Sequence, residues 1–100
     1  MTYSVHSTAT IPTASAQKYI DQLAKHWGHK CEVAQADGVT SVTFPFAAVA
    51  MRAFDDHLQV DVSTATHEHL TKSKEVFMAH IDRFAFREAP LAATWQDKAD

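Results

Sequence analysis

Hydrophobic residues recur with helical spacing in two segments of the chain. In the first segment they return every three or four residues from Ala16 to Trp27, and polar residues occupy the positions between them. Thr13 or Ser15 can accept hydrogen bonds from amides of the first turn. Gly28 follows the last apolar residue, where a residue with a positive φ angle is expected. The pattern therefore predicts an amphipathic helix that ends at Gly28.

The second helical segment runs roughly from Ala65 to Phe84. The candidates for its N-terminal cap are Ser63, Thr64 and Thr66. One stripe of this helix is predicted to face the core, and it consists of Leu70, Ser73, Phe77, Ile81 and Phe84. His80, Arg83 and Arg87 follow the flank of that stripe at spacings of three and four residues. Core packing and a candidate site are therefore predicted on the same element.

Apolar and polar residues alternate in the remaining segments, which is typical of half-buried strands. The predicted strands are Tyr3–Thr10, Cys31–Ala34, Val39–Phe44, Ala47–Phe54 and Leu58–Val62, with Ala92–Trp95 as a candidate for a short last strand. Tight turns are predicted at Asp37-Gly38 and at Asp55-Asp56. The polar residues from Gln96 to Asp100 are predicted to fray.

The order of these elements predicts the fold class. Consecutive strands joined by tight turns pair antiparallel, and each helix has one apolar face to bury. We therefore predict an α+β two-layer sandwich, with an antiparallel sheet of about four to six strands and two helices on one face. A single domain is expected over residues 1–96, followed by a polar tail at 97–100. The uncovered face of the sheet carries alanines that a homodimer could bury, whereas polar Arg52, Gln59 and Asp61 favour partial solvation, so a homodimer is only slightly favoured.

Composition narrows the class of protein. One hundred residues suffice for one domain, and 46% hydrophobic with 21% charged residues is typical of a soluble globular chain. A formal net charge of −3 argues against a nucleic-acid-binding protein. Cys31 has no partner cysteine, and the N-terminus lacks the basic start and apolar run of a signal peptide. No apolar run is long enough for a membrane span, so a cytoplasmic location is predicted.

A first candidate cluster follows the first helix. His26, His29 and Cys31 carry ligand types that suit zinc or another borderline metal. However, Gly28 is expected to end the helix between the two histidines, and no second cluster completes a four-ligand set. A structural role is the alternative, because His26, His29 and Lys30 lie where cationic side chains complement the helix dipole. We assign no metal and no cofactor.

A second candidate cluster lies on the second helix. His80, Arg83 and Arg87 could converge on a carboxylate or phosphate, because arginine offers a planar donor fork and histidine a switchable donor. The structural alternative is that the arginines complement the helix dipole, with Asp82 and Glu88 as local salt-bridge partners. His26 or His80 could also act as an acid or base. With only two glycines, the chain has no glycine-rich phosphate loop.

Several motifs resemble a known family. They are, in chain order, Tyr19-x-x-x-Leu23-x-x-His26-x-x-His29-Lys30, Phe44-Pro45-Phe46, His80-x-x-Arg83-Phe84-Ala85-Phe86-Arg87-Glu88 and Thr94-Trp95-Gln96. In this order they resemble the bacterial "domain of unknown function 2218" family over nearly the whole chain. The resemblance implies a small bacterial intracellular domain without an assigned reaction. Some relatives are joined to, or encoded beside, flavin-dependent siderophore-interacting proteins, which implies a connection to iron–siderophore utilisation.

These observations favour a non-catalytic binding or accessory module. Its ligand would be an anionic small molecule, for example an iron chelate with carboxylates or catecholates, and its partner a siderophore-handling protein. The predicted ligand-binding residues are His26, His29, Lys30, His80, Arg83 and Arg87. Two alternatives remain open: a small enzyme that uses His26 or His80 as acid or base, and a metal-binding module. These residues form a site only if the cluster on the first helix faces the cluster on the second helix.

Overall fold

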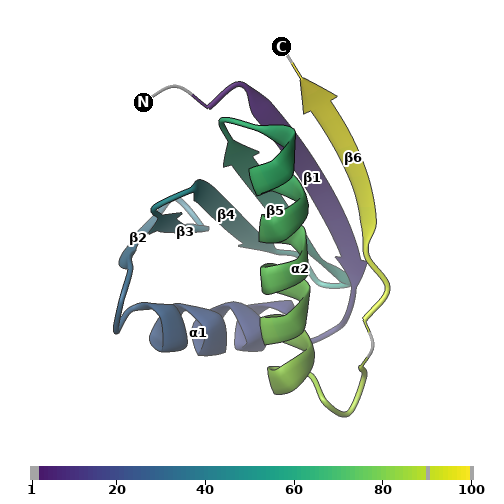
Figure 1. The fold of residues 1–100 in the computed structure, drawn as a ribbon. Helices are drawn as coiled ribbons and strands as arrows, with labels where there is room; N and C mark the ends of the chain where they lie inside the picture. Colours follow the sequence, from purple (N-terminus) through teal and green to yellow (C-terminus); the bar gives the residue numbers. More distant parts are fainter. Residues whose placement is uncertain (1–2, 90, 100) are drawn as a thin grey trace.

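The computed structural model describes residues 3–89 and 91–99, which form six strands and two helices (Figure 1). The strands are β1 (Val5–Pro12), β2 (Glu32–Ala36), β3 (Val39–Phe44), β4 (Ala47–Ala53), β5 (His57–Thr64) and β6 (Thr94–Ala99). The helices are α1 (Ala16–Trp27) and α2 (His67–Phe84). The predicted order of elements is confirmed, including the short last strand.

All strand pairs in the sheet are antiparallel, and the strand order is β2-β3-β4-β5-β1-β6. The first strand therefore lies inside the sheet, between β5 and β6. Both helices pack against the same face of the sheet and run in clearly different directions across it (Figure 1). The predicted α+β fold, with an antiparallel sheet and two helices, is confirmed.

The core lies between the sheet and the helices because the strands alternate strictly. In β5, Leu58, Val60 and Val62 are fully buried, whereas Gln59 and Asp61 on the other face are half-buried. The helices add their predicted stripes, with Ile20, Leu23 and Trp27 from α1 and Leu70, Ser73, Phe77 and Ile81 from α2. Burial of each large apolar side chain contributes about 1.5–3 kcal/mol, so this layer is the main source of stability.

The two glycines have different roles. Asp37 and Gly38 have φ angles of 54° and 79°, which is the two-residue hairpin turn predicted between β2 and β3. The predicted positive φ at Gly28 is wrong, because its φ is −60° and its N–H donates to the Ala24 carbonyl at 2.8 Å. A Cβ at Gly28 would lie 2.9 Å from that same carbonyl oxygen. Glycine is therefore required there for a close approach rather than for a left-handed conformation.

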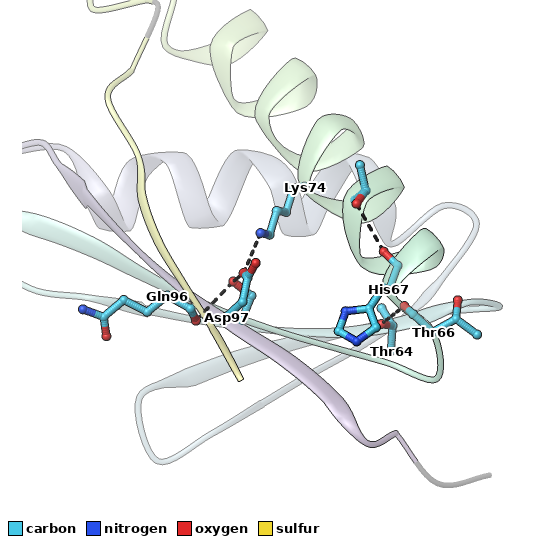
Figure 2. Close-up of polar contacts among 8 residues, drawn as sticks. Thr64, Thr66, His67, Lys74, Gln96 and Asp97 are labelled. Atoms are coloured by element: carbon cyan, nitrogen blue, oxygen red, sulfur yellow. Dashed lines mark hydrogen bonds and ion pairs between the residues drawn. The ribbon is translucent and has the colours of Figure 1, made fainter. Parts of the chain in front are cut away.

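The caps of the two helices differ as well. At α2, the Thr66 side chain accepts a hydrogen bond from the His69 N–H at 3.1 Å, as predicted for one of the three candidate caps. The Thr64 hydroxyl donates to the Thr66 carbonyl at 2.8 Å, which holds the end of β5 against the helix start (Figure 2). At α1, Ser15 makes no side-chain cap, and the Thr13 hydroxyl instead accepts from the Ser15 N–H at 3.1 Å.

The C-terminal strand is longer than predicted. Residues 96–99, predicted to fray, pair with β1 in β6, and Asp100 lies outside the described residues. Asp97 explains the difference, because its Oδ1 accepts hydrogen bonds from the Ser7 hydroxyl at 2.5 Å and from Lys74 Nζ at 2.6 Å (Figure 2). These hydrogen bonds join three segments that are far apart in the sequence, so no local hydrophobic pattern predicts them.

Neither helix of the described residues packs on the second face of the sheet (Figure 1). Its side chains are mostly polar, half-buried in the central strands and exposed towards the edges, and several bond to one another, as in the 2.7 Å hydrogen bond from the Thr8 hydroxyl to Asp61. Burial of this face in a homodimer stays a prediction. Neither helix of the described chain is long and apolar enough to cross a bilayer.

Candidate functional site

The two predicted clusters meet where α1 and α2 approach each other near their C-terminal ends. The ring centroids of His26 and His80 lie 5.2 Å apart, with the ring planes tilted by 49°. His26 also meets Phe84 edge-on at 5.9 Å. Since His80 and Phe84 are four residues apart, they lie on the same side of α2, and both reach the last turn of α1.

A surface hollow of about 370 Å³ opens beside this histidine pair, and we call it the basic hollow. Its lining consists of His26, Trp27, His29, Lys30, Cys31, Phe44 and His80. This lining contains three histidines and a lysine and no acidic residue. Its volume lies within the range of small-molecule sites, about 300–1,000 Å³.

Aromatic side chains form one wall of the basic hollow. Trp27 is only 6% exposed, and its ring meets that of Phe44 edge-to-face at 5.2 Å. From the sequence, Trp27 was predicted as the end of an apolar helix stripe and Phe44 as the end of a strand, and neither was a candidate site residue. Their second role follows from their position at the rim of the core, where the end of α1 crosses the end of β3.

The orientation of the His80 ring is fixed by the backbone. Its Nδ1 lies 2.8 Å from the Val76 carbonyl oxygen. Because a carbonyl only accepts, Nδ1 must carry the proton in this contact. The other nitrogen, Nε2, is then an acceptor in the neutral ring and a donor when the ring is protonated. His80 is therefore a switchable group at the edge of the basic hollow.

Desolvation and nearby positive charges both act on His26. Desolvation is the largest cause that lowers the pKa of its imidazole below the ordinary value, followed by the positive charges of His80, Arg83, His29 and Lys30. Arg83 is exposed and does not line the basic hollow, but it is close enough to contribute to this effect. Within residues 3–89 and 91–99, the ion pairs are His57–Asp56 and Lys74–Asp97. No carboxylate of these residues therefore forms an ion pair with the cationic cluster.

Arg87 does not join the cluster. The helix ends at Phe84, and the chain then turns, so the helical spacing that predicted Arg87 on the flank of α2 no longer applies. Its guanidinium lies 5.8 Å from the ring of Phe86, which is 71% exposed. Of the six predicted site residues, four line the basic hollow, Arg83 lies close to His26, and Arg87 lies on the loop after α2.

Comparison with known families supports the resemblance found in the sequence. The model of the family described as "Uncharacterized protein conserved in bacteria (DUF2218)" matches residues 8–96. The chain belongs to this bacterial family. The matched range includes all six predicted site residues.

A solved structure resembles this DUF2218 domain over nearly its full length. The NMR structure of PA4090 from Pseudomonas aeruginosa is 28% identical, with 95% of this chain and 96% of that chain covered, at a TM-score of 0.76. No curated protein matches the chain significantly. The comparisons therefore identify the family and the fold, and they name no ligand or reaction.

The acidic residues predicted to neutralise the arginines have other partners in this DUF2218 domain. Asp82 accepts a hydrogen bond from the Leu91 N–H at 3.1 Å. Glu88 accepts a short hydrogen bond from the Tyr19 hydroxyl and another from the Thr13 hydroxyl at 3.1 Å. Burial first, and then the hydrogen bond and charge of Glu88, raise the pKa of Tyr19 above its ordinary value. These contacts join segments that are far apart in the chain, so local spacing could not predict them.

For a metal ion, the described part of the domain contains no group of three or more histidine, cysteine or acidic side chains that could hold one. The ring of His69, in the first turn of α2, lies 6.0 Å from the ring of Phe46 between centroids. Within the same residues, neither His26 nor His80 is hydrogen-bonded to a carboxylate. The groups gathered at the basic hollow are therefore cationic or switchable donors, suited to hold negative charge.

Proposed function

We propose that this DUF2218 domain is a non-catalytic binding module that holds a small anion in the basic hollow. The observation that carries the proposal is the meeting of His26 and His80 beside Lys30 and Arg83, with no carboxylate in the lining. Cations that crowd together without partners repel one another, and this repulsion lowers the pKa of His26 in addition to desolvation, which is the larger cause. A bound anion would relieve the repulsion.

Each group would contribute in a different way. Arg83 offers a planar fork of donors, and Lys30 offers a compact positive charge, so both hold a carboxylate without any change of protonation. His80 would donate from Nε2 once its ring is protonated, since Nδ1 already donates to the backbone. Such charge-assisted hydrogen bonds are roughly twice as strong as neutral ones.

The chemistry of the basic hollow suits carboxylates and catecholates. An iron chelate that carries such groups is one ligand of this kind. It is also the ligand through which the domain would serve a siderophore-handling protein. That connection rests on the family resemblance, and the basic hollow supplies only the complementary charge.

The proposal is tested by thermal stabilisation with a panel of anions at low ionic strength: inorganic phosphate, citrate and ferric citrate. Wild-type protein should be stabilised, and Lys30→Met and Arg83→Met should lose the effect. Lys18→Met and Arg87→Met are matched controls, because each removes the same charge from an exposed residue that neither lines the basic hollow nor lowers the pKa of His26. Equal stabilisation of all four variants, or none of the wild-type protein, would refute the proposal.

The enzyme alternative is favoured by one observation, the fixed orientation of the His80 ring by the Val76 carbonyl. A histidine held in this way can act as a general base through Nε2. The two functions differ in the fate of the bound anion. A binding module returns it unchanged after prolonged incubation. An enzyme converts it, and His80→Gln would then abolish conversion while Lys30 and Arg83 retain the anion.

A further inference from the structure

Aromatic rings form a continuous wall from the basic hollow to the turn between β3 and β4. The wall consists of His26, His80, Trp27, Phe44 and Phe46, and consecutive ring centroids lie 5.2, 5.4, 5.2 and 6.1 Å apart. These separations are typical of interacting aromatic pairs. The cationic end of the wall and its purely apolar end are therefore parts of one surface.

A small void lies behind the apolar end of this wall. Its volume is about 10 Å³, and its lining includes Trp27 and Phe44, which also line the basic hollow, together with Phe46 and Phe77. One hydroxyl lines it as well, that of Ser73, which donates to the His69 carbonyl at 2.7 Å. A space of this size is at the lower limit for one water molecule, and its single hydroxyl offers such a water too few polar partners.

Phe46 lines this void from a turn of the sheet. It lies in the two-residue turn between Phe44 and Ala47, which pair with each other at the end of the β3–β4 ladder. Its half-buried ring stacks on Phe44 and touches His69 at 6.0 Å. A change in the Phe46 side-chain rotamer therefore breaks no backbone hydrogen bond of the sheet.

We propose that the anion held in the basic hollow is an aromatic carboxylate, with its ring against Trp27 and Phe44 and its carboxylate towards Lys30 and Arg83. This inference rests on the proposed function and specifies its ligand class. A ring is favoured over an alkyl chain because aromatic pairs gain energy beyond the area that they bury, and because cations are attracted to ring faces. The size of the accepted ring system is limited at the apolar end of the wall, where Phe46 stacks on the Phe44 ring that lines the basic hollow.

The experiment is a set of NMR-detected titrations at constant ionic strength with acetate, cyclohexanecarboxylate and benzoate, which carry the same charge. Benzoate should bind about tenfold more tightly than acetate, and clearly more tightly than cyclohexanecarboxylate of similar size. Ring-current shifts should appear at the Trp27 indole. Equal affinity for all three carboxylates would overturn the inference and leave the proposed function standing, whereas no binding of any of them would refute both.

Phe46→Ala tests the limit assigned to Phe46. The variant should gain affinity for 2-naphthoate relative to benzoate, because removal of the Phe46 ring exposes the face of Phe44 on which it stacks. Phe54→Ala is the matched control, since Phe54 lies at the turn between β4 and β5 and is already 41% exposed. An unchanged ratio in a folded Phe46→Ala protein would overturn this role. If the variant does not fold, the comparison of the three carboxylates in the wild-type protein decides the ligand class.

Discussion

Charged side chains are arranged in opposite ways at two places in this domain. On the β6 side of α2, the Asp97 carboxylate accepts hydrogen bonds from both Ser7 and Lys74, so its charge is matched by a cation and a hydroxyl (Figure 2). At the C-terminal ends of the helices, His26 is surrounded by four groups that are positive or can become so. Among the described residues no carboxylate pairs with that cluster.

Paired charges in this domain stabilise the fold, whereas the unpaired cations mark the candidate site. The Asp97 contacts tie β1, α2 and β6 together, and the Glu88 contacts tie the loop after α2 to the start of α1, so both stabilise the fold. At the basic hollow, the rings of His26 and His80 pack α1 against α2, but the charges of Lys30 and Arg83 have no ion-pair partner among the described residues. Removal of a paired group should therefore destabilise the domain, whereas removal of the charge of Lys30 or Arg83 should change mainly the electrostatic properties of this region.

The largest effect is expected from Glu88→Ala. The substitution leaves the Tyr19 and Thr13 hydroxyls, which are only 5% and 6% exposed, without their acceptor. The free energy of unfolding should fall by about 1–3 kcal/mol, measured by urea denaturation. Glu75→Ala, at an exposed position of α2, is the control and should stay within about 0.5 kcal/mol of the wild type. A decrease no larger than that of the control would show that these hydrogen bonds contribute little.

A smaller loss of stability is expected from Asp97→Asn. Asparagine keeps the shape but loses the charge that pairs with Lys74, so the free energy of unfolding should fall by about 1 kcal/mol. Hydrogen exchange of the β6 amides should become faster, while Asp55→Asn in an exposed turn leaves it unchanged. Unchanged exchange in β6 would contradict the anchoring role of Asp97.

The same contacts predict the effect of acid. The hydrogen bond from Lys74 first, and then that from Ser7, lower the pKa of Asp97 below its ordinary value. Because the folded-state pKa is lowered, the contribution of Asp97 is fully present above its unfolded pKa, and it is lost as the pH falls through the folded pKa. In Asp97→Asn, this part of the loss of stability at low pH should be absent from a series of denaturation curves.

The basic hollow should respond differently to substitution. Arg83→Met removes a positive charge near His26, so protonation of His26 becomes easier and its pKa should rise towards the ordinary value. The free energy of unfolding should stay within about 0.5 kcal/mol of the wild type. An NMR titration of the histidine ring protons measures the shift. Arg87→Met should leave the pKa of His26 unchanged, and an equal shift in both variants would contradict the assignment of Arg83 to the cluster.

The smallest expected effect is the pH dependence of anion binding. The pKa of His26 is lowered in the free protein, by desolvation first and then by His80 and Arg83 from α2 and by His29 and Lys30 from the turn after α1. A bound anion offsets these charges, so binding should take up protons and tighten as the pH falls below the ordinary histidine value. Calorimetry in two buffers of different ionisation enthalpy measures this uptake. A release of protons when the anion binds would contradict this coupling between anion binding and protonation of His26.

Local patterns in the sequence predict most of this fold. The apolar stripes of α1 and α2, the alternation in β5 and the Asp37-Gly38 turn each depend on neighbouring residues, and each is confirmed. The extent of β6 could not be predicted, because Asp97 is anchored by Ser7, which lies 90 residues away in the chain. The conformation of Gly28 was predicted incorrectly because the helical hydrogen bonding continues one residue further than its apolar stripe.

The candidate site shows a similar limit. Residue types and helical spacing identified His26, His29, Lys30, His80 and Arg83 as candidates, but only the crossing of α1 and α2 brings the two histidines together. Arg87 was included because the helix was extrapolated beyond Phe84. Phe44 and Phe46 were not identified as candidate site residues, because aromatic residues at the end of a strand ordinarily pack in the core.

One NMR titration tests the central claim most directly. Benzoate is added at constant ionic strength and about pH 6, near the ordinary histidine pKa, while the resonances of the seven histidine rings are followed. The account predicts that His26 and His80 shift together and saturate at one common ligand concentration, while His57 and His67, which lie outside the basic hollow, do not move. A uniform small shift of all histidines, or no shift at His26 and His80, would contradict it.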